Sequence, residues 1–362
     1  MTERMRERPV RGDRSPGNLA LVFRDFGKLE APQVGARLYE ALSPRVAEDA
    51  ELLELVAAVP ASQPPPNLLF GAVHYLLLDR RHEPLARYYA DLGWDEAPGE
   101  AFEAFREFVL RERTAIEGLL RTRRVQTNVV QRCTSLVPAF AHVAGGMSEH
   151  ALALVEIGPS AGLNMLWDRY GYAYPRLDGS LGQRWGDLES AVQLSTEVRG
   201  ERELPDLPAS IPVARRVGLE LEPVDVADDD AVRWLRALIW PEHVERHERL
   251  EAAIAIARHD PPPIVGGDAT ELLAGALVEA PGDAALCAYA THALYQIPRE
   301  GMQRIYAALE AASAERVVWF VVIEGTGREH SEVFMHRYEG GRRTTEHVAN
   351  CNPHGRWIEW LG

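Results

Sequence analysis

One segment, an apolar stretch that runs into a glycine-rich turn, constrains the fold of this chain most strongly. Residues 151–157 are typical of a buried parallel strand, Gly158 ends that strand, and residues 163–169 favour a helix. In an open parallel sheet, ligands bind just beyond the carboxyl ends of the strands. Glycine in such a turn lets the backbone approach a ligand closely. The segment therefore predicts a ligand site beside Glu156, whose carboxylate suits a cationic amine.

Several interpretations fit this turn. A dinucleotide-binding turn needs G-x-G-x-x-G, and Ser160 stands where the middle glycine belongs. Gly158 to Gly162 also satisfies G-x-S-x-G, the nucleophile elbow of serine hydrolases, with Ser160 as the nucleophile. A third interpretation is the cofactor turn of methyltransferases, in which an acidic residue precedes spaced glycines. A tight turn without a function is the fourth, and the turn alone does not decide among them.

The next two expected strands resemble those of class I methyltransferases, enzymes that use S-adenosylmethionine (SAM). In residues 217–223 an apolar strand meets Glu220, which the resemblance implies binds the ribose hydroxyls, as a carboxylate can. In residues 264–269, Asp268 and Ala269 match a signature whose aspartate meets the adenine amine. The same resemblance assigns further cofactor-binding roles to residues at the first strand: Glu156, Gly158, Ser160, Gly162 and Asn164.

The loop after the fourth expected strand supplies the remaining candidates. Residues 290–298 resemble the corresponding loop of small-molecule methyltransferases, which makes His292 a candidate general base or substrate ligand. A satisfied loop histidine is an equally good interpretation of His292. Asn128, Tyr295 and Trp240 are the candidate substrate-binding residues. Aromatic residues of this kind more often belong to a core, and polar residues among helices more often join those helices.

The sequence as a whole predicts an α/β fold. Residues 1–18 are expected to form a flexible tail, residues 19–150 a helical domain, and residues 151–362 a Rossmann-like domain with an insertion at about 172–212. Strand candidates alternate with helical segments, which favours a mostly parallel sheet covered on both faces. The resemblance implies seven strands, with one reversed strand at an edge, made by the hairpin of residues 333–349.

Charge and cysteine content limit the choice of partners. The chain has 54 acidic and 39 basic residues, a net charge of -15, and no basic face, so nucleic acid is a poor partner and a small molecule a better one. Its 3 cysteines are far apart, which supports neither a disulfide framework nor a metal site. Because neither a signal peptide nor a membrane-spanning run is visible, we expect a cytoplasmic protein without a membrane partner. The oligomeric state cannot be read from the sequence.

Two histidines at helical spacing form a weak metal pattern. His243 and His247 are four residues apart, but Val244 follows His243, so the H-E-x-x-H order of zinc proteases is absent. An exposed, charged helix face is the favoured interpretation.

From about residue 19 to the end, the chain resembles a family of uncharacterised bacterial proteins, a domain of unknown function. The segments that carry this resemblance are 65–69, 125–128, 156–164 and 234–241. That family supplies no activity and supports only the domain layout. The leading expectation is methyl transfer from SAM to a small molecule. The alternatives are a SAM-fold binding or regulatory protein without transfer, and a serine hydrolase that uses Ser160.

Overall fold

The structure, a computed structural model, describes residues 8–94, 96–145, 151–180, 182–325 and 330–362. It divides into two compact units, of which the first comprises Met1–Thr127 and Asp228–Leu250. The second comprises Asn128–Ala227 and Glu251–Gly362. The contacts thus group residues 128–145 with the sheet and residues 228–250 with the helices, whereas the sequence suggested a single boundary near residue 150.

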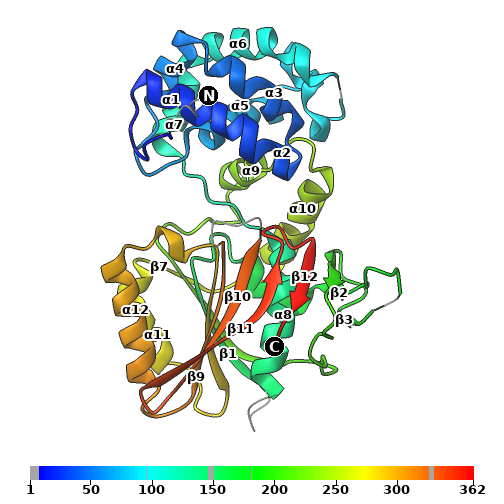
Figure 1. Ribbon diagram of the computed structural model, residues 1–362, viewed down its shortest axis with the longest axis vertical. Coiled ribbons are helices and arrows are strands. Elements are labelled where there is room, and N and C mark those ends of the chain that lie inside the picture. Colours follow the sequence, from blue (N-terminus) through cyan, green and yellow to red (C-terminus); the bar gives the residue numbers. More distant parts are fainter. Residues whose placement is uncertain (1–7, 95, 146–150, 181, 326–329) are drawn as a thin grey trace, which may run out of the picture. The chain divides into compact units, whose positions relative to one another are not determined.

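The first unit consists of helices in the part of it that the structure describes (Figure 1). At its centre lies α5 (Pro65–Leu78), which is apolar on nearly all sides and therefore buried on nearly all sides. Two prolines begin α5, where the amide donor that proline lacks has no partner in the helix. The Phe70 ring of α5 stacks on Tyr39 with ring centres 4.3 Å apart. The other helices are α1 (Pro16–Asp25), η1 (Phe26–Glu30), α2 (Ala31–Val34), α3 (Arg37–Val46), α4 (Ala50–Val56), η2 (Pro84–Tyr88), η3 (Ala90–Leu92), η4 (Pro98–Glu100), α6 (Ala101–Arg111), α7 (Arg113–Thr122), α9 (Asp229–Ala237) and the beginning of α10 (Val244–His259).

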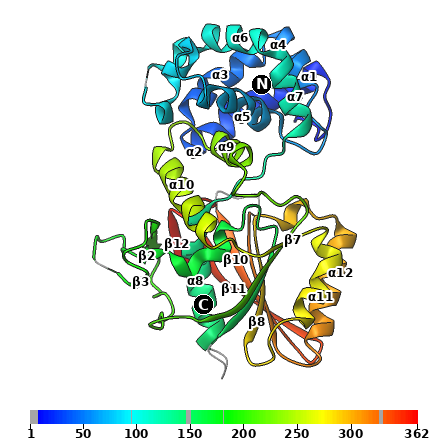
Figure 2. The ribbon, with the colours of Figure 1, turned by 180° about the vertical axis from the view of Figure 1, so that it is seen from behind.

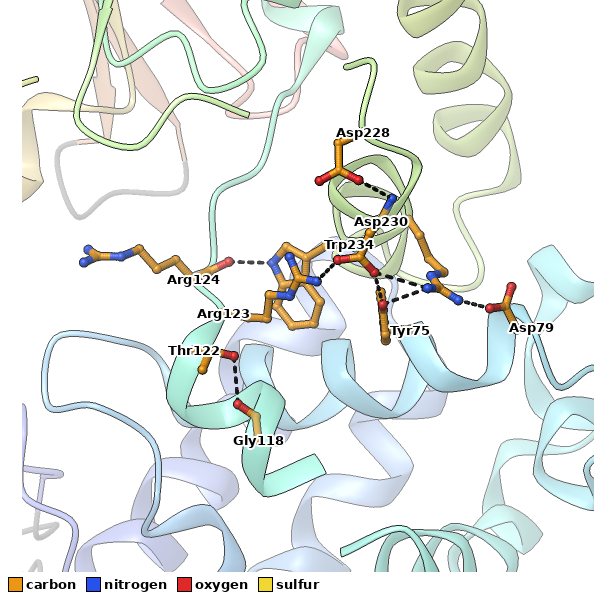
Figure 3. Close-up of polar contacts among 10 residues, drawn as sticks. Tyr75, Asp79, Gly118, Thr122, Arg123, Arg124, Asp228, Asp230 and Trp234 are labelled. Atoms are coloured by element: carbon orange, nitrogen blue, oxygen red, sulfur yellow. Dashed lines mark hydrogen bonds and ion pairs between the residues drawn. The ribbon is translucent and has the colours of Figure 1, made fainter. Parts of the chain in front are cut away.

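A polar network fastens α9 to the rest of the helical unit (Figure 3). The Asp230 carboxylate accepts hydrogen bonds from the Tyr75 hydroxyl and the Arg123 guanidinium, although 107 residues separate Arg123 from Asp230. The Trp234 indole N–H donates to the backbone oxygen of Arg124 at 2.7 Å. These contacts join Arg123 and Arg124, close to the point where the chain leaves this unit, to α9, where the chain returns to it.

The second unit is built on a nine-stranded sheet in the order β5-β12-β11-β10-β9-β8-β1-β6-β7. The strands from β9 to β7 in this order are parallel to one another. Strand β10 is antiparallel to β9 and β11, and β12 is antiparallel to β11 and parallel to β5. The strands are β1 (Leu152–Ile157), β5 (Glu197–Arg199), β6 (Val213–Glu220), β7 (Ile264–Gly266), β8 (Ala285–Thr291), β9 (Val318–Gly325), β10 (Ser331–Glu339), β11 (Arg342–Cys351) and β12 (Trp357–Trp360).

This sheet confirms the mixed α/β class and the mostly parallel arrangement, with β1 in its interior. The expected number of strands was wrong: the sheet has nine within the described residues, not seven. Three strands, β5, β10 and β12, run opposite to β1, where one was expected. The two additional strands are short: β5 has 3 residues and β12 has 4. Strands of this length give too little alternation to be recognised in a sequence.

Helices cover both faces of the sheet (Figures 1 and 2). Ala153, Val155 and Ile157 of β1 enter a core with α11 (Ala269–Val278) and α12 (Arg299–Ala312). Because strand side chains alternate between faces, Glu156 points to the other face, beside Tyr289, whose ring packs against α8. The remaining elements are η5 (Val130–Arg132), α8 (Cys133–Gly145), η6 (Leu163–Arg169), a small sheet of β2 (Gly171–Ala173), β3 (Arg184–Gly186) and β4 (Gln193–Ser195), and η7 (Leu294–Gln296).

Among the described residues, no helix combines the length and the apolar character that crossing a lipid bilayer requires.

Candidate functional site

The turn after β1 has a backbone that glycine adopts more readily than other residues. Gly158 and Gly162 have φ angles of 74° and 73°, and Ser160 between them has a φ of 58°. A Cβ atom on Gly158 would lie 2.6 Å from the Cβ of Ala293, and one on Gly162 would lie 2.6 Å from the ring of Pro262. Both glycines are therefore required by backbone conformation and by close packing.

This turn lies at the switch point of the sheet, where the strands that follow β1 in sequence are added first on one side of it and then on the other. From β1 the order continues through β6 to β7 on one side, and through β8 to β9 on the other. Both neighbours of β1 are parallel to it, so the carboxyl ends of β1, β6 and β8 lie at one edge. The loops that leave such a switch point diverge and leave a crevice in which ligands bind in open α/β sheets.

Glu156 contributes a buried carboxyl group next to this turn. Glu156 is only 1% exposed, and its Oε2 accepts a hydrogen bond of 2.9 Å from the Tyr289 hydroxyl. Burial raises the pKa of Glu156 to about 8; the charge of Glu220 adds to this, while the Tyr289 hydrogen bond and the charge of Arg132 act in the opposite direction. Near neutral pH the group therefore holds a proton, which a bound cation would release.

Glu220 links the ends of two strands. It is the last residue of β6, and its Oε2 accepts a hydrogen bond of 2.8 Å from the backbone N–H of Ser160 in the turn after β1. Its Oε1 accepts a longer bond of 3.3 Å from the N–H of Glu222. The carboxylates of Glu156 and Glu220 thus belong to one site, as the parallel strands predicted.

Two buried polar atoms at the turn have no hydrogen-bond partner among the described residues. These atoms are the hydroxyl oxygen of Ser160 and the Oδ1 of Asn128. The amide nitrogen of Asn128 donates to the backbone oxygen of Pro159 at 2.7 Å, which holds the side chain against the turn. Buried polar atoms in native proteins are nearly all paired. Their presence therefore points to a ligand or ordered water at the turn.

The loop after β8 brings His292 to the same edge of the sheet. His292 has a φ of 53°, and its Nε2 lies 3.0 Å from the Ser331 hydroxyl oxygen. Burial, assisted by the charge of Arg132, lowers the pKa of His292 to about 3, so the ring is neutral at physiological pH. Glu324, which follows the buried part of β9, accepts the N–H groups of the two residues after His292, each at 2.8 Å. It thereby fixes the loop.

Glu324 was not singled out by sequence reasoning, although a signal for it exists. It follows an apolar strand, as an acidic residue also does at Glu156 and Glu220. The same rule, an acidic residue at the carboxyl end of a buried strand, therefore finds all three.

Other predicted cofactor residues lie in more exposed positions. Asp268 is exposed and caps α11, since its Oδ1 accepts the N–H of Thr270 at 2.8 Å. Ala269 is the first residue of that helix. Tyr295, a predicted substrate contact, is 65% exposed. The structure assigns a local role to Asp268, and one of its carboxylate oxygens remains available.

Two further predicted residues have internal partners. Asn164 is buried, and its amide nitrogen lies 3.4 Å from the Thr291 hydroxyl oxygen. Trp240 belongs to the helical unit, where its ring packs near Phe26 and Tyr39 with ring centres 6.0 and 5.6 Å away. Trp240 is thus part of the edge of that unit's core.

The two arginines of β6 form ion pairs with residues other than Glu156 and Glu220. Arg216 forms a bidentate ion pair with Asp168 at 2.6 and 2.7 Å. Arg215 pairs with Glu279 at 2.5 Å. Arg132 is the cation that acts electrostatically on Glu156. Its Nε is anchored to the backbone oxygen of Pro353 at 3.0 Å.

The fold and these residues define the chain as an α/β protein with buried acidic side chains at the switch point of an open, mostly parallel sheet. It belongs to a bacterial family described as "Uncharacterized protein conserved in bacteria" (DUF2332), which matches residues 20–360. No curated protein and no solved structure matches the chain.

Proposed function

We propose that this protein transfers a methyl group from SAM to a small molecule, using the site at the carboxyl ends of β1 and β6. The observation that carries the proposal is the hydrogen bond from the Ser160 N–H to the Glu220 carboxylate, which unites the glycine-rich turn and the end of β6 in one site. The choice of SAM comes from the sequence signatures around Glu156, Glu220 and Asp268. The strand order around β1 supports the proposal, because open α/β sheets bind ligands beside such a switch point.

The residues of this site suit the polar groups of SAM. Glu156 suits the ammonium group, because a cation beside a buried carboxyl favours its ionised form. A carboxylate has about four lone-pair sites, and Glu220 uses its oxygens for two backbone N–H groups, which leaves capacity for ribose hydroxyls. The unpaired oxygens of Ser160 and Asn128 can accept further donors. Asp268 retains one oxygen for the adenine amine.

Little covalent chemistry is required of the chain. The sulfonium of SAM supplies an already activated methyl group, and the protein aligns the acceptor and excludes water. With a pKa of about 3, His292 is a weak base. Its proposed role is therefore to accept a hydrogen bond from the acceptor molecule and to orient it. Transfer of a proton to solvent then follows without a strong protein base.

The variant Glu220→Gln tests the cofactor site with little disturbance of the fold. Glutamine keeps an oxygen for the Ser160 N–H but removes the charge that strengthens hydrogen bonds to the ribose. We expect SAM to bind about ten-fold more weakly, a loss of about 1.4 kcal/mol, by isothermal titration calorimetry. Glu220→Ala is a poorer choice, because it also leaves a buried N–H unpaired at a cost of about 1–3 kcal/mol.

Glu271→Gln, on the exposed surface of α11, provides the matched control and should bind SAM like the unmodified chain. Absence of any heat with SAM or its demethylated product contradicts the proposal. Equal binding by the Glu220 and Glu271 variants would exclude Glu220 from the cofactor site. Binding without methylation of any small-molecule acceptor would instead favour the alternative of a binding or regulatory protein.

Serine hydrolysis is a second candidate, which the backbone conformation of Ser160 favours. A nucleophile elbow holds its serine in a strained turn between a strand and a helix, and Ser160 has a φ of 58° in such a turn. Within the described residues, however, its hydroxyl has no hydrogen-bond partner, whereas a nucleophilic serine needs a neighbouring base. We therefore expect no labelling of Ser160 by a fluorophosphonate in mass spectrometry. Labelling that Ser160→Ala abolishes would favour the hydrolase.

A further inference from the structure

The loop after β8 holds His292 in a backbone conformation that residues other than glycine rarely adopt. His292 has a φ of 53°, in the left-handed region. Its backbone N–H donates to the oxygen of Ile323 at 2.8 Å, and the Glu324 carboxylate accepts the next two N–H groups, each at 2.8 Å. Strained backbone of this kind persists only where the surrounding structure over-determines it, and it clusters at functional sites. Two neighbouring residues of β9 thus hold His292 in one position.

The ring of His292 has a partner in the protein interior. Its Nε2 lies 3.0 Å from the hydroxyl oxygen of Ser331, the first residue of β10, and Ser331 is 0% exposed. His292 itself is half-buried, so its ring is not enclosed on all sides. Sequence reasoning did not single out Ser331, because 39 residues separate it from His292. Only the antiparallel pairing of β10 with β9 brings Ser331 back to the edge at which His292 lies.

The loop of His292 contacts the glycine-rich turn at which the cofactor is proposed to bind. A Cβ atom on Gly158 would lie 2.6 Å from the Cβ of Ala293, the residue that follows His292. Among the described residues, the ring of His292 has no hydrogen bond other than the one at Nε2. The two nitrogens of an imidazole point in different directions, so Nδ1 points away from Ser331. Nδ1 is therefore the nitrogen available to a molecule bound beside this turn.

We propose that Ser331 positions His292 so that Nδ1 accepts a hydrogen bond from the methyl acceptor, and that this acceptor is an uncharged amine. The inference rests on the proposed function, in which His292 orients the acceptor. A neutral imidazole carries one N–H, which belongs to Nε2 when Nδ1 accepts. The Ser331 hydroxyl, which has two acceptor lone pairs, takes the hydrogen bond from Nε2. Because Ser331 is fully buried, it does not itself meet the substrate.

The weak basicity of His292 narrows the class of acceptor. Nδ1 accepts only from a group that carries a hydrogen, which excludes ionised carboxylates, thioethers and tertiary amines. With a pKa lowered by burial to about 3, His292 does not remove a proton from an alcohol before the methyl group arrives. An uncharged primary or secondary amine attacks with its lone pair while its N–H stays on Nδ1. The bond from methyl carbon to nitrogen forms, the sulfur–carbon bond breaks with its electron pair on sulfur, and the new ammonium releases a proton to solvent.

The tautomer of His292 tests the role of Ser331 without any acceptor. In the full chain near neutral pH, ¹⁵N-labelled histidine should show the tautomer with its proton on Nε2, assigned by the loss of that signal in His292→Gln. Ser331→Ala should give a mixture of both tautomers, because nothing then selects one nitrogen. Thr345→Ala is the matched control, since it removes a hydroxyl 2.8 Å from Nδ1 of His336 on the same hairpin, and should leave His292 unchanged.

Two results overturn the role of Ser331. One is a proton on Nδ1 of His292 in the unmodified chain, which is observed independently of whether any variant folds. The other is a folded Ser331→Ala variant whose His292 spectrum equals that of the Thr345→Ala control.

Methyl transfer to simple probes tests the acceptor class. With SAM, aniline and N-methylaniline should be methylated, as read by mass spectrometry, whereas N,N-dimethylaniline, phenol and benzoate should not. Ser331→Ala should lower kcat/KM for aniline about ten-fold, with SAM binding in calorimetry unchanged, and Thr345→Ala should change neither. Transfer to phenol or benzoate instead, or SAM binding without transfer to either amine, overturns the amine class. Lack of SAM binding contradicts the proposed function itself, and the tautomer still decides the role of Ser331.

Discussion

Replacing Gly158 with alanine is expected to destabilise the sheet unit by roughly 2–5 kcal/mol. The left-handed backbone, with a φ of 74°, costs an L-residue about 1–2 kcal/mol. The added Cβ would also lie 2.6 Å from the Cβ of Ala293, and relief of such overpacking costs typically 1–3 kcal/mol. Both atoms in this contact are Cβ atoms close to the backbone, so no flexible side chain can move away. Urea unfolding followed by circular dichroism measures the loss.

Gly179→Ala separates the two causes. Gly179 has a similar φ of 78°, but a Cβ there would meet nothing within 4 Å. We therefore expect it to show the cost of the backbone conformation alone, about 1–2 kcal/mol. Equal destabilisation by the two variants would show that close packing against Ala293 does not contribute. The close approach to Ala293 thus makes glycine necessary at position 158 independently of its proposed role in cofactor binding.

The sequence predicted the strands of the sheet's interior well, for a physical reason. Strands such as β1 and β8 are buried on both faces, so they read as continuous apolar runs bounded by polar loops. Segment β5 lies in the expected insertion, and nothing in its three residues predicts that it adds to the far edge of the main sheet. That pairing depends on a tertiary contact with β12, which sequence periodicity does not encode.

The sequence also predicted that Glu156 and Glu220 lie together, but it did not predict their hydrogen-bond partners. Glu156 and Glu220 follow from the rule that parallel strands end at one edge, and their shared turn confirms that they lie together. Their hydrogen-bond partners were less accessible to sequence reasoning. Tyr289 meets Glu156 because β1 and β8 pair in a particular register. Register is set by packing of the whole sheet rather than by a local motif.

The interpretation of His247 as part of an exposed helix face was wrong. His243 precedes α10 and His247 lies in the first turn of that helix, where His247 is only 7% exposed and its Nε2 lies 3.9 Å from a carboxylate oxygen of Asp91. The charged neighbours of His247 in sequence suggested solvent. Its burial results from contacts with η3 and α5, elements more than 150 residues earlier. A charged helical segment can thus bury a single polar residue that its own pattern does not distinguish.

The pH dependence of stability should change strongly in the variant Glu156→Gln. In the folded chain the pKa of Glu156 is raised by burial to about 8, whereas its ordinary value is 4.5. Between these values the folded state binds more protons than the unfolded state, so this group lowers stability as pH rises through the window. Below the window it has no effect, and above pH 8 its full penalty is present. Glutamine has the same shape, can accept from Tyr289, and does not titrate.

Glu156→Gln should therefore match the original chain near pH 4.5 and exceed its stability by roughly 3–5 kcal/mol above pH 8, because each pKa unit corresponds to about 1.36 kcal/mol. Urea unfolding of both proteins across this range measures the difference, with Glu271→Gln on exposed α11 as the control. Other titrating groups are shared by both proteins and cancel in the comparison. A difference that does not grow with pH contradicts a raised pKa at Glu156.

The same experiment bears on the cofactor, because an ammonium group beside Glu156 stabilises its ionised form. Saturating SAM should then remove most of the penalty from the original chain at high pH, and a SAM-bound protein that retains it would not place the ammonium group at Glu156.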